Sequence, residues 1–231
     1  MSVPVILPRI MEVGANASAR LPDVLASLKC SRPLIVTDKT MVKLGQAQRL
    51  HGILEAQGIR AEVFDDTVPE PTAASIQAGV DRLRSGDFDA IVALGGGSPI
   101  DSAKAMAILA RYGGVIRDYR FPRQVNEAGL PLIAIPTTAG TGSEVTRFTI
   151  ITDETTDEKL LCAGIGFMPI AALIDYTLTL SLPARTTADT GIGDPKASTA
   201  DKGRRCFEHV SARLGGFMAE LAAADPADMY E

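Results

Sequence analysis

Residues 90–109 read AIVALGGGSPIDSAKAMAIL, and this stretch determines the kind of fold that the chain forms. Ala90–Leu94 is a short, fully apolar run, which is typical of a strand buried on both faces of a parallel sheet. Three glycines follow it, and residues 98–109 then show a helical pattern. The sequence therefore predicts a strand, a glycine-rich turn and a helix, in this order.

The turn in this stretch is a candidate phosphate site. Its residues are Gly95, Gly96, Gly97 and Ser98. Ser98 is a good N-cap, Pro99 suits the first helical position, and Asp101 completes a pattern like a capping box. A helix that begins there presents free N–H groups and a positive dipole end, and the glycines let a pyrophosphate approach the backbone. The alternative is a tight turn without a ligand, since the pattern is not the G-x-G-x-x-G fingerprint.

Apolar runs and helical patterns alternate along the rest of the chain. Further strands are expected at 33–37, 61–64, 132–135 and 171–174, further helices at 42–57 and 72–84, an edge hairpin at 3–13, and a hairpin made by 148–152 and 159–161. Strands that alternate with helices imply βαβ units. The expected class is α/β, with a Rossmann-like parallel sheet and helices on both of its faces.

The composition changes after residue 192. The breaker cluster Gly193-Asp194-Pro195 is followed by one amphipathic helix, expected between Cys206 and Leu221. We therefore expect a dinucleotide-binding α/β domain over 1–192 and a short helical segment over 193–231.

Two more stretches follow expected strands and carry polar side chains. Thr137, Thr138 and Thr141 follow the strand at 132–135, and Asp38 follows the strand at 33–37. Open α/β sheets bind ligands at the carboxyl ends of their strands, where hydroxyls suit phosphate and ribose oxygens. A carboxylate such as Asp38 accepts hydrogen bonds from a ribose 2′-hydroxyl and repels a 2′-phosphate. A polar turn and a helix N-cap are equally consistent with the two stretches taken alone.

Charge and composition argue against several functions. The net charge is -5, tryptophan is absent, and no basic run is longer than Arg204-Arg205, so nucleic acid is not an expected partner. No apolar run of membrane-spanning length and no signal-peptide pattern occur, so no membrane partner is expected. The three cysteines are widely spaced, which fits a reducing compartment, and a cytoplasmic protein is expected. The two histidines, His51 and His209, are both expected at the surface.

Taken together, these motifs resemble those of the iron-containing alcohol dehydrogenase family, from about residue 3 to residue 192. The matching text is VTDK at 36–39, VPEPT at 68–72, GGGSPIDSAKAMA at 95–107, GLPLIAIPTTAGTGSEVT at 129–146, ITDE at 151–154, LIDYTLTLSLP at 173–183 and TADTGI at 187–192. The resemblance implies an N-terminal nucleotide-binding α/β domain and a C-terminal all-helical domain, with a metal in the cleft between them. On this basis, residues 193–231 are a short helical remnant of the all-α domain.

The resemblance also implies a reaction and roles for residues. The reaction is hydride transfer between NAD and a small alcohol or aldehyde, with iron or zinc acting on the substrate oxygen. The implied cofactor-binding residues are Gly96, Gly97 and Ser98 for the pyrophosphate, Asp38 for the adenosine ribose, Thr137, Thr138 and Thr141 in the cleft, Lys159 near the nicotinamide ribose, and Leu178 beside the cofactor. Whether the chain forms a homo-oligomer is left open.

The amino-acid sequence departs from the family pattern T-G-[MI]-D-A-L-x-H-A-I-E at Gly193. Asp194 is a displaced candidate for the metal aspartate, and no histidine is near it. The metal-binding half is therefore expected to be almost entirely missing, through a deletion with truncation, a frameshift or natural divergence. Three hypotheses follow: a family dehydrogenase or aldehyde reductase with impaired turnover, a catalytically inactive NAD-binding module, and a glycerol-phosphate or sugar-phosphate-cyclising relative. The third is the least favoured, because such enzymes also need the missing histidines.

Overall fold

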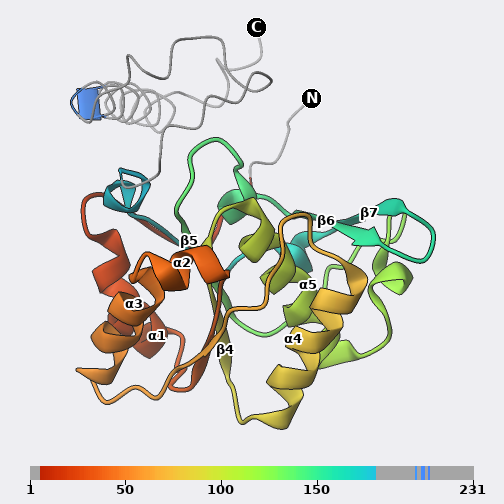
Figure 1. The fold of residues 1–231 in the computed structure, drawn as a ribbon, viewed down its shortest axis with the longest axis horizontal. Coiled ribbons are helices and arrows are strands. Elements are labelled where there is room, and N and C mark those ends of the chain that lie inside the picture. Colours follow the sequence, from red (N-terminus) through yellow and green to blue (C-terminus); the bar gives the residue numbers. More distant parts are fainter. Residues whose placement is uncertain (1–5, 181–200, 202–203, 206–207, 209–231) are drawn as a thin grey trace, which may run out of the picture. The chain divides into compact units, whose positions relative to one another are not determined.

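The computed structural model describes residues 6–180, 201, 204–205 and 208 (Figure 1). The chain divides into two units, residues 1–181 and 182–231, and the fold described below is that of the first. The predicted domain boundary after residue 192, the metal candidate Asp194, and most of the helix predicted at 206–221 lie outside the described residues.

A six-stranded, wholly parallel sheet forms the centre of the first unit. The strand order is β1-β8-β5-β4-β2-β3. The strands are β1 (Ile10–Val13), β2 (Pro33–Val36), β3 (Glu62–Phe64), β4 (Ala90–Gly95), β5 (Leu132–Pro136) and β8 (Ala171–Ile174). Every residue of β4 and β5 is buried, as expected for central strands covered on both faces. The predicted Rossmann-like α/β class is confirmed.

Helices cover both faces of this sheet (Figure 1). They are α1 (Leu21–Ser27), α2 (Lys39–Lys43), α3 (Gln46–Glu55), α4 (Ala73–Ser85) and α5 (Gly97–Tyr112), with short 3-10 helices η1 (Ala17–Arg20), η2 (Ile116–Tyr119), η3 (Ser143–Val145), η4 (Ile165–Phe167) and η5 (Tyr176–Thr179). Successive strand residues point to opposite faces, so Ile91 packs with α4 and α5 in one core, while Val92 packs with α1 and α3 in the other.

The predicted hairpin is confirmed as β6 (Phe148–Asp153) paired antiparallel with β7 (Glu158–Ala163). It forms a separate two-stranded sheet that packs on α5. The Thr149 hydroxyl joins the two elements by donating to the Asp101 carbonyl oxygen at 2.9 Å.

Two predictions about the first third of the chain are wrong. The helix predicted at 42–57 is two helices, because Gly45 adopts a left-handed conformation (φ 73°) that ends α2 and starts α3. The edge hairpin predicted at 3–13 is, within its described residues 6–13, the single strand β1. β1 pairs parallel with β8 over four residue pairs, Ile10 to Ala171 through Val13 to Ile174, so it needs no hairpin partner of its own.

The helix α1 was not predicted from the sequence. It is seven residues long and starts beside Pro22, which is tolerated in the first turn of a helix. Among the described residues, no helix combines the length and the apolar character needed to cross a membrane.

Candidate functional site

A pocket of about 480 Å³ lies at the carboxyl edge of the sheet, where β2, β4 and β5 end. It is lined by Asp38, Lys39, Thr40, Thr67, Val68, Pro69, Gly96, Gly97, Ser98, Pro99, Thr138 and Thr141. The structure thus brings together most of the residues that the sequence offered as cofactor ligands. They come from segments that are far apart in the chain, and they meet because the strands before them are parallel neighbours.

The helix after the glycine turn begins earlier than the sequence predicted. The helix α5 begins at Gly97, its N-cap is Gly96, and no side chain caps it. The capping box predicted for Ser98 and Asp101 is therefore wrong, because Ser98 already lies inside the helix. The first N–H groups of a helix have no partner within it, so an uncapped start that faces a pocket suits an anion.

Close approach explains why glycines occupy this turn. Gly95 has φ +148°, a backbone conformation that other residues rarely adopt, and a Cβ atom there would lie 2.6 Å from the Pro99 Cγ atom. A Cβ atom on Gly96 would lie 3.2 Å from the Thr138 Oγ1 atom, and one on Gly97 would lie 3.4 Å from the Thr141 Cγ2 atom. The absence of a side chain at Gly96 therefore lets Thr138 lie close to the start of α5, whereas a Cβ atom on Gly97 would make an ordinary van der Waals contact with Thr141.

The threonine-rich loop, residues 137–142, carries hydroxyl groups that lack partners. Its start is held by a hydrogen bond from the Thr137 amide to the Gly95 carbonyl at 2.9 Å. The Oγ1 atoms of Thr137 and Thr138 are buried and have no hydrogen-bond partner. A buried, unsatisfied polar atom costs about 1–3 kcal/mol, which a ligand that bonds to it recovers.

Asp38 caps a helix and also lies in the lining of the pocket. Its Oδ1 atom caps α2 by accepting from the Thr40 amide at 2.8 Å and from the Met41 amide at 2.9 Å. The side chain also lines the pocket. The neighbouring Lys39 ammonium donates to Asp65 at 3.0 Å and to Asp66 at 2.7 Å, and these hydrogen bonds raise its pKa. The one cationic residue in the lining of this pocket is therefore already paired.

Five other predicted site residues do not line the pocket. Lys159, on β7, is an exposed residue whose ammonium lies 3.0 Å from the Glu70 carboxylate. Leu178 is 5% exposed and packs in the core that contains α1 and α3. Thr137, the first residue of the threonine-rich loop, is buried, and Gly95 is the last residue of β4. Asp101 accepts from the Ile150 amide of the hairpin at 3.4 Å. Their roles toward a cofactor stay predictions.

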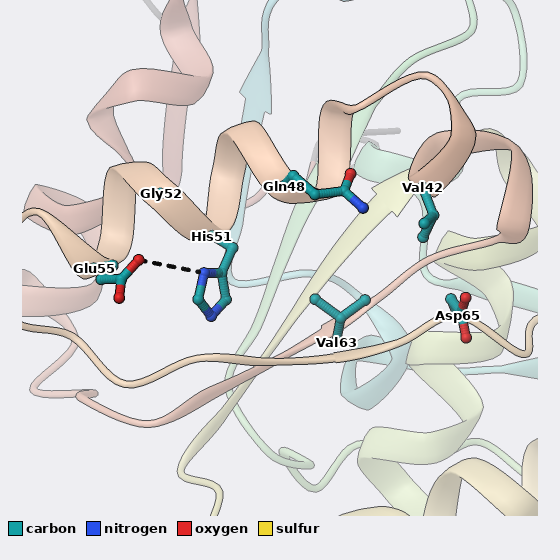
Figure 2. Close-up of a pocket in the computed structure, with 7 residues that line it drawn as sticks. All are labelled: Val42, Gln48, His51, Gly52, Glu55, Val63 and Asp65. Carbon is teal, nitrogen blue, oxygen red and sulfur yellow. Dashed lines mark ion pairs between the residues drawn. The ribbon is translucent and has the colours of Figure 1, made fainter.

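A second hollow, of about 370 Å³, lies beside α3 and β3 (Figure 2). Figure 2 shows His51 and Glu55 side by side on α3, with Asp65 at the opposite end of the hollow. The His51 Nδ1 atom lies 3.9 Å from the Glu55 carboxylate, and its Nε2 atom lies 3.1 Å from the Ala61 carbonyl. The prediction of a surface histidine is confirmed for His51, whose side chain is 40% exposed, and His209 lies outside the described residues.

The pocket at the sheet edge is therefore the better candidate for a nucleotide, since it alone of these two hollows contains a helix start and the threonine-rich loop. Within residues 6–180 and the few described residues after them, no three His, Cys, Asp or Glu side chains cluster in a way that could hold a metal ion.

Comparison with known proteins decides the family. The family model described as iron-containing alcohol dehydrogenase matches residues 8–176. The chain belongs to the iron-containing alcohol dehydrogenase family. Alcohol dehydrogenase 4 of Saccharomyces cerevisiae (strain YJM789) is 38% identical to it over 186 residues, which are 80% of this chain and 49% of the relative.

Solved structures of this family resemble the chain over the same region. A 1,3-propanediol oxidoreductase is 30% identical, with a TM-score of 0.76, and the match covers 80% of this chain and 48% of that one. A sulfoacetaldehyde reductase from Bifidobacterium kashiwanohense in complex with NAD+ is 32% identical, with a TM-score of 0.74, and the match covers 80% and 49%. The chain thus spans about half the length of these members of the iron-containing alcohol dehydrogenase family.

Two features around the site were not predicted from the sequence. The loop after β3 contributes Thr67, Val68 and Pro69 to the pocket. The stretch VPEPT at 68–72 is part of the family resemblance, but no role in the site was predicted for it. Lys104, in the middle of α5, is fully buried. A lysine flanked by Ala103 and Ala105 in an otherwise apolar helix was the signal that could have identified it.

Proposed function

We propose that this chain binds NAD in the pocket at the carboxyl edge of the sheet. It would serve as the cofactor-binding half of an alcohol dehydrogenase or aldehyde reductase that acts on a small alcohol or aldehyde. The observation that carries the proposal is the uncapped start of α5, which faces a pocket shared with Asp38 and Thr138. The NAD+ complex of the related sulfoacetaldehyde reductase supports it.

The lining residues fit a dinucleotide in chemistry. The amides at the start of α5 and the positive end of its dipole would hold the pyrophosphate. Asp38 would accept from a ribose hydroxyl, and the unpartnered Thr138 hydroxyl would bond to the ligand. Bound NAD would supply the hydride chemistry, accepting a hydride from an alcohol or giving one to a carbonyl. What the chain itself does is to bind and orient the dinucleotide.

The family's iron or zinc would act on the substrate oxygen. Such sites use several imidazole and carboxylate ligands, and the part of the chain that the structure describes offers no such cluster. We therefore assign no step to a metal. This leaves a second candidate function, a catalytically inactive NAD-binding module.

Two measurements on the purified chain separate these functions. Elemental analysis after dialysis gives the iron and zinc content, and an assay with NAD and short diols gives turnover. A dehydrogenase shows both bound metal and NADH formation. An inactive module binds NAD, as measured by calorimetry, with neither of them.

Thr138→Val is expected to weaken NAD binding by about three- to tenfold while raising the stability of the ligand-free chain. The substitution removes one hydrogen bond to the ligand, worth about 0.5–1.5 kcal/mol, and it also removes a buried hydroxyl that has no partner. Calorimetry with NAD and thermal unfolding without it measure the two effects.

A matched control for this prediction is Thr155→Val, in the β6–β7 turn. Its hydroxyl donates to the Asp153 carboxylate at 2.6 Å, so the control should lose stability and keep its NAD affinity. If Thr138→Val binds NAD as tightly as the unmodified chain, the Thr138 hydroxyl does not bond to the ligand.

A further inference from the structure

Lys104 is a buried cation in the middle of α5, the helix whose start lines the pocket, and the proposed function leaves it without a role. Its side chain is 0% exposed. Its ammonium donates to the Phe148 carbonyl at 2.7 Å and to the Thr146 hydroxyl at 3.2 Å, and it lies 3.8 Å from the Asp101 carboxylate. One lysine of α5 thus bonds to Thr146, which follows η3, and to Phe148, the first residue of β6.

Asp101 ties the same segment to α5 from the other side of the lysine. Its carboxylate accepts hydrogen bonds from the Ile150 amide and the Ser143 hydroxyl. The carboxylate of Glu144 also interacts electrostatically with Lys104, and its Oε2 atom is buried without a hydrogen-bond partner. Residues 143–150 are therefore fastened to the second turn of α5 by charged groups.

This attachment fixes one end of the threonine-rich loop. The other end is held by the hydrogen bond from the Thr137 amide to the Gly95 carbonyl. Thr138 and Thr141 lie between the two attachments and face the glycine turn. If residues 143–150 detach from α5, the loop is free to move away from the start of the helix.

We propose that the protonated Lys104 is a positioning residue for NAD, which holds the threonine-rich loop against the start of α5 so that Thr138 and Thr141 face the bound dinucleotide. The inference rests on the proposed function, because it concerns the same pocket. Lys104 does not touch the pocket lining in this arrangement, and it acts through the loop.

The surroundings of Lys104 predict a pH dependence. Burial lowers its pKa to about 8, while Asp101 and then Glu144 act in the opposite direction. The core faces of α4 and β4 that pack on α5 are apolar, with Ile76, Val80, Leu83, Ile91 and Ala93. Arg84 of α4 contacts α5 at the Leu109 carbonyl, toward the far end of the helix.

NAD affinity and folding stability should respond to this titration with opposite signs. Above about pH 8 the folded chain loses the Lys104 proton, which weakens the attachment and the affinity. The unfolded chain keeps that proton up to the ordinary value of 10.5, so it binds more protons than the folded chain between the two values. The contribution of Lys104 to stability therefore rises over that range. A lysine that only filled space would not lower the affinity while it raised the stability.

The test is calorimetry with NAD on the full chain from pH 6.5 to pH 9.5, with thermal unfolding of the ligand-free chain over the same range. We expect the affinity to fall by up to about tenfold between pH 7 and pH 9, as the fraction of competent protein falls. Glu144→Gln removes one group that raises the lysine pKa, so its affinity should fall at a lower pH. Lys104→Met should bind more weakly, with no fall over this range.

Matched controls are Glu127→Gln and Lys29→Met, at exposed positions away from the pocket, and both should follow the unmodified chain. The role of Lys104 would be overturned if the NAD affinity did not depend on pH. It would also be overturned if the affinity of Glu144→Gln fell at the same pH as that of the unmodified chain. Either result would leave the NAD site itself intact. Absence of NAD binding by the unmodified chain at every pH would instead refute the proposed function, and this inference with it.

Discussion

Gly96→Val is expected to lower NAD affinity by about a hundredfold or more. Gly96 has ordinary backbone angles (φ -76°, ψ -160°), so valine is not excluded by the backbone itself. The added methyl groups, however, would stand at the uncapped start of α5, where the pyrophosphate is expected. Loss of two charge-assisted hydrogen bonds, each worth about 1.5–3 kcal/mol, accounts for this magnitude. Calorimetry with NAD measures it directly.

Folding must be measured in parallel for this variant, because a Cβ atom on Gly96 approaches the Thr138 hydroxyl to 3.2 Å. The movement needed is a few tenths of an ångström, so we expect a small loss of thermal stability. Gly52→Val is the matched control, since a Cβ atom on Gly52 of α3 meets no atom within 4 Å. If Gly96→Val folds and binds NAD normally, the glycine turn is not the phosphate site.

The unmodified chain is expected to bind NAD about thirtyfold more tightly than NADP. The Asp38 carboxylate would bond to the 2′-hydroxyl of NAD and repel the 2′-phosphate of NADP. At an effective dielectric constant of about 20, two charges 4 Å apart repel by about 4 kcal/mol, of which solvent screening at this pocket mouth leaves about half. Lys39 is paired with Asp65 and Asp66, so it does not offset this repulsion.

Asp38→Asn removes the negative charge of this side chain but keeps a residue that can cap the helix, so it separates the two effects. Asparagine also caps helices well, so α2 should remain stable while the preference for NAD falls to a few-fold. Asp38→Gly should relax the preference as well, with a further loss of stability of a few tenths of a kcal/mol. Asp81→Asn, on the exposed face of α4, is the control. Equal affinities of the unmodified chain for NAD and NADP would show that Asp38 does not face the ribose.

The parallel sheet could be predicted from the sequence because its strands are short apolar runs separated by helical patterns. The central strand β4 is buried at every residue, and its text AIVALG has no polar side chain. The position of β1 could not be predicted in the same way. Its burial alternates, which an edge hairpin would also show, and its partner β8 lies about 160 residues further along the chain.

The pocket lining was predicted better than its geometry. Parallel strands end at one edge, so Asp38, Gly96 and Thr138 were expected to meet, and all three line the same pocket. The N-cap of α5 was placed two residues late, because Ser98 is a good capping residue, whereas the N-cap position of the observed helix is Gly96. The buried attachment around Lys104 depends on the hairpin packing on α5, which spacing along the sequence does not specify.

Titration of the purified chain with NAD by calorimetry, with ADP-ribose in parallel, measures whether this pocket binds a dinucleotide. The residues that line the pocket would hold the adenosine ribose and the pyrophosphate, which both ligands share. We expect saturable binding of one NAD per chain, competition by ADP-ribose, and loss of binding of both ligands in Gly96→Val. Failure of the folded, unmodified chain to bind either ligand, or binding that Gly96→Val leaves unchanged, would contradict it.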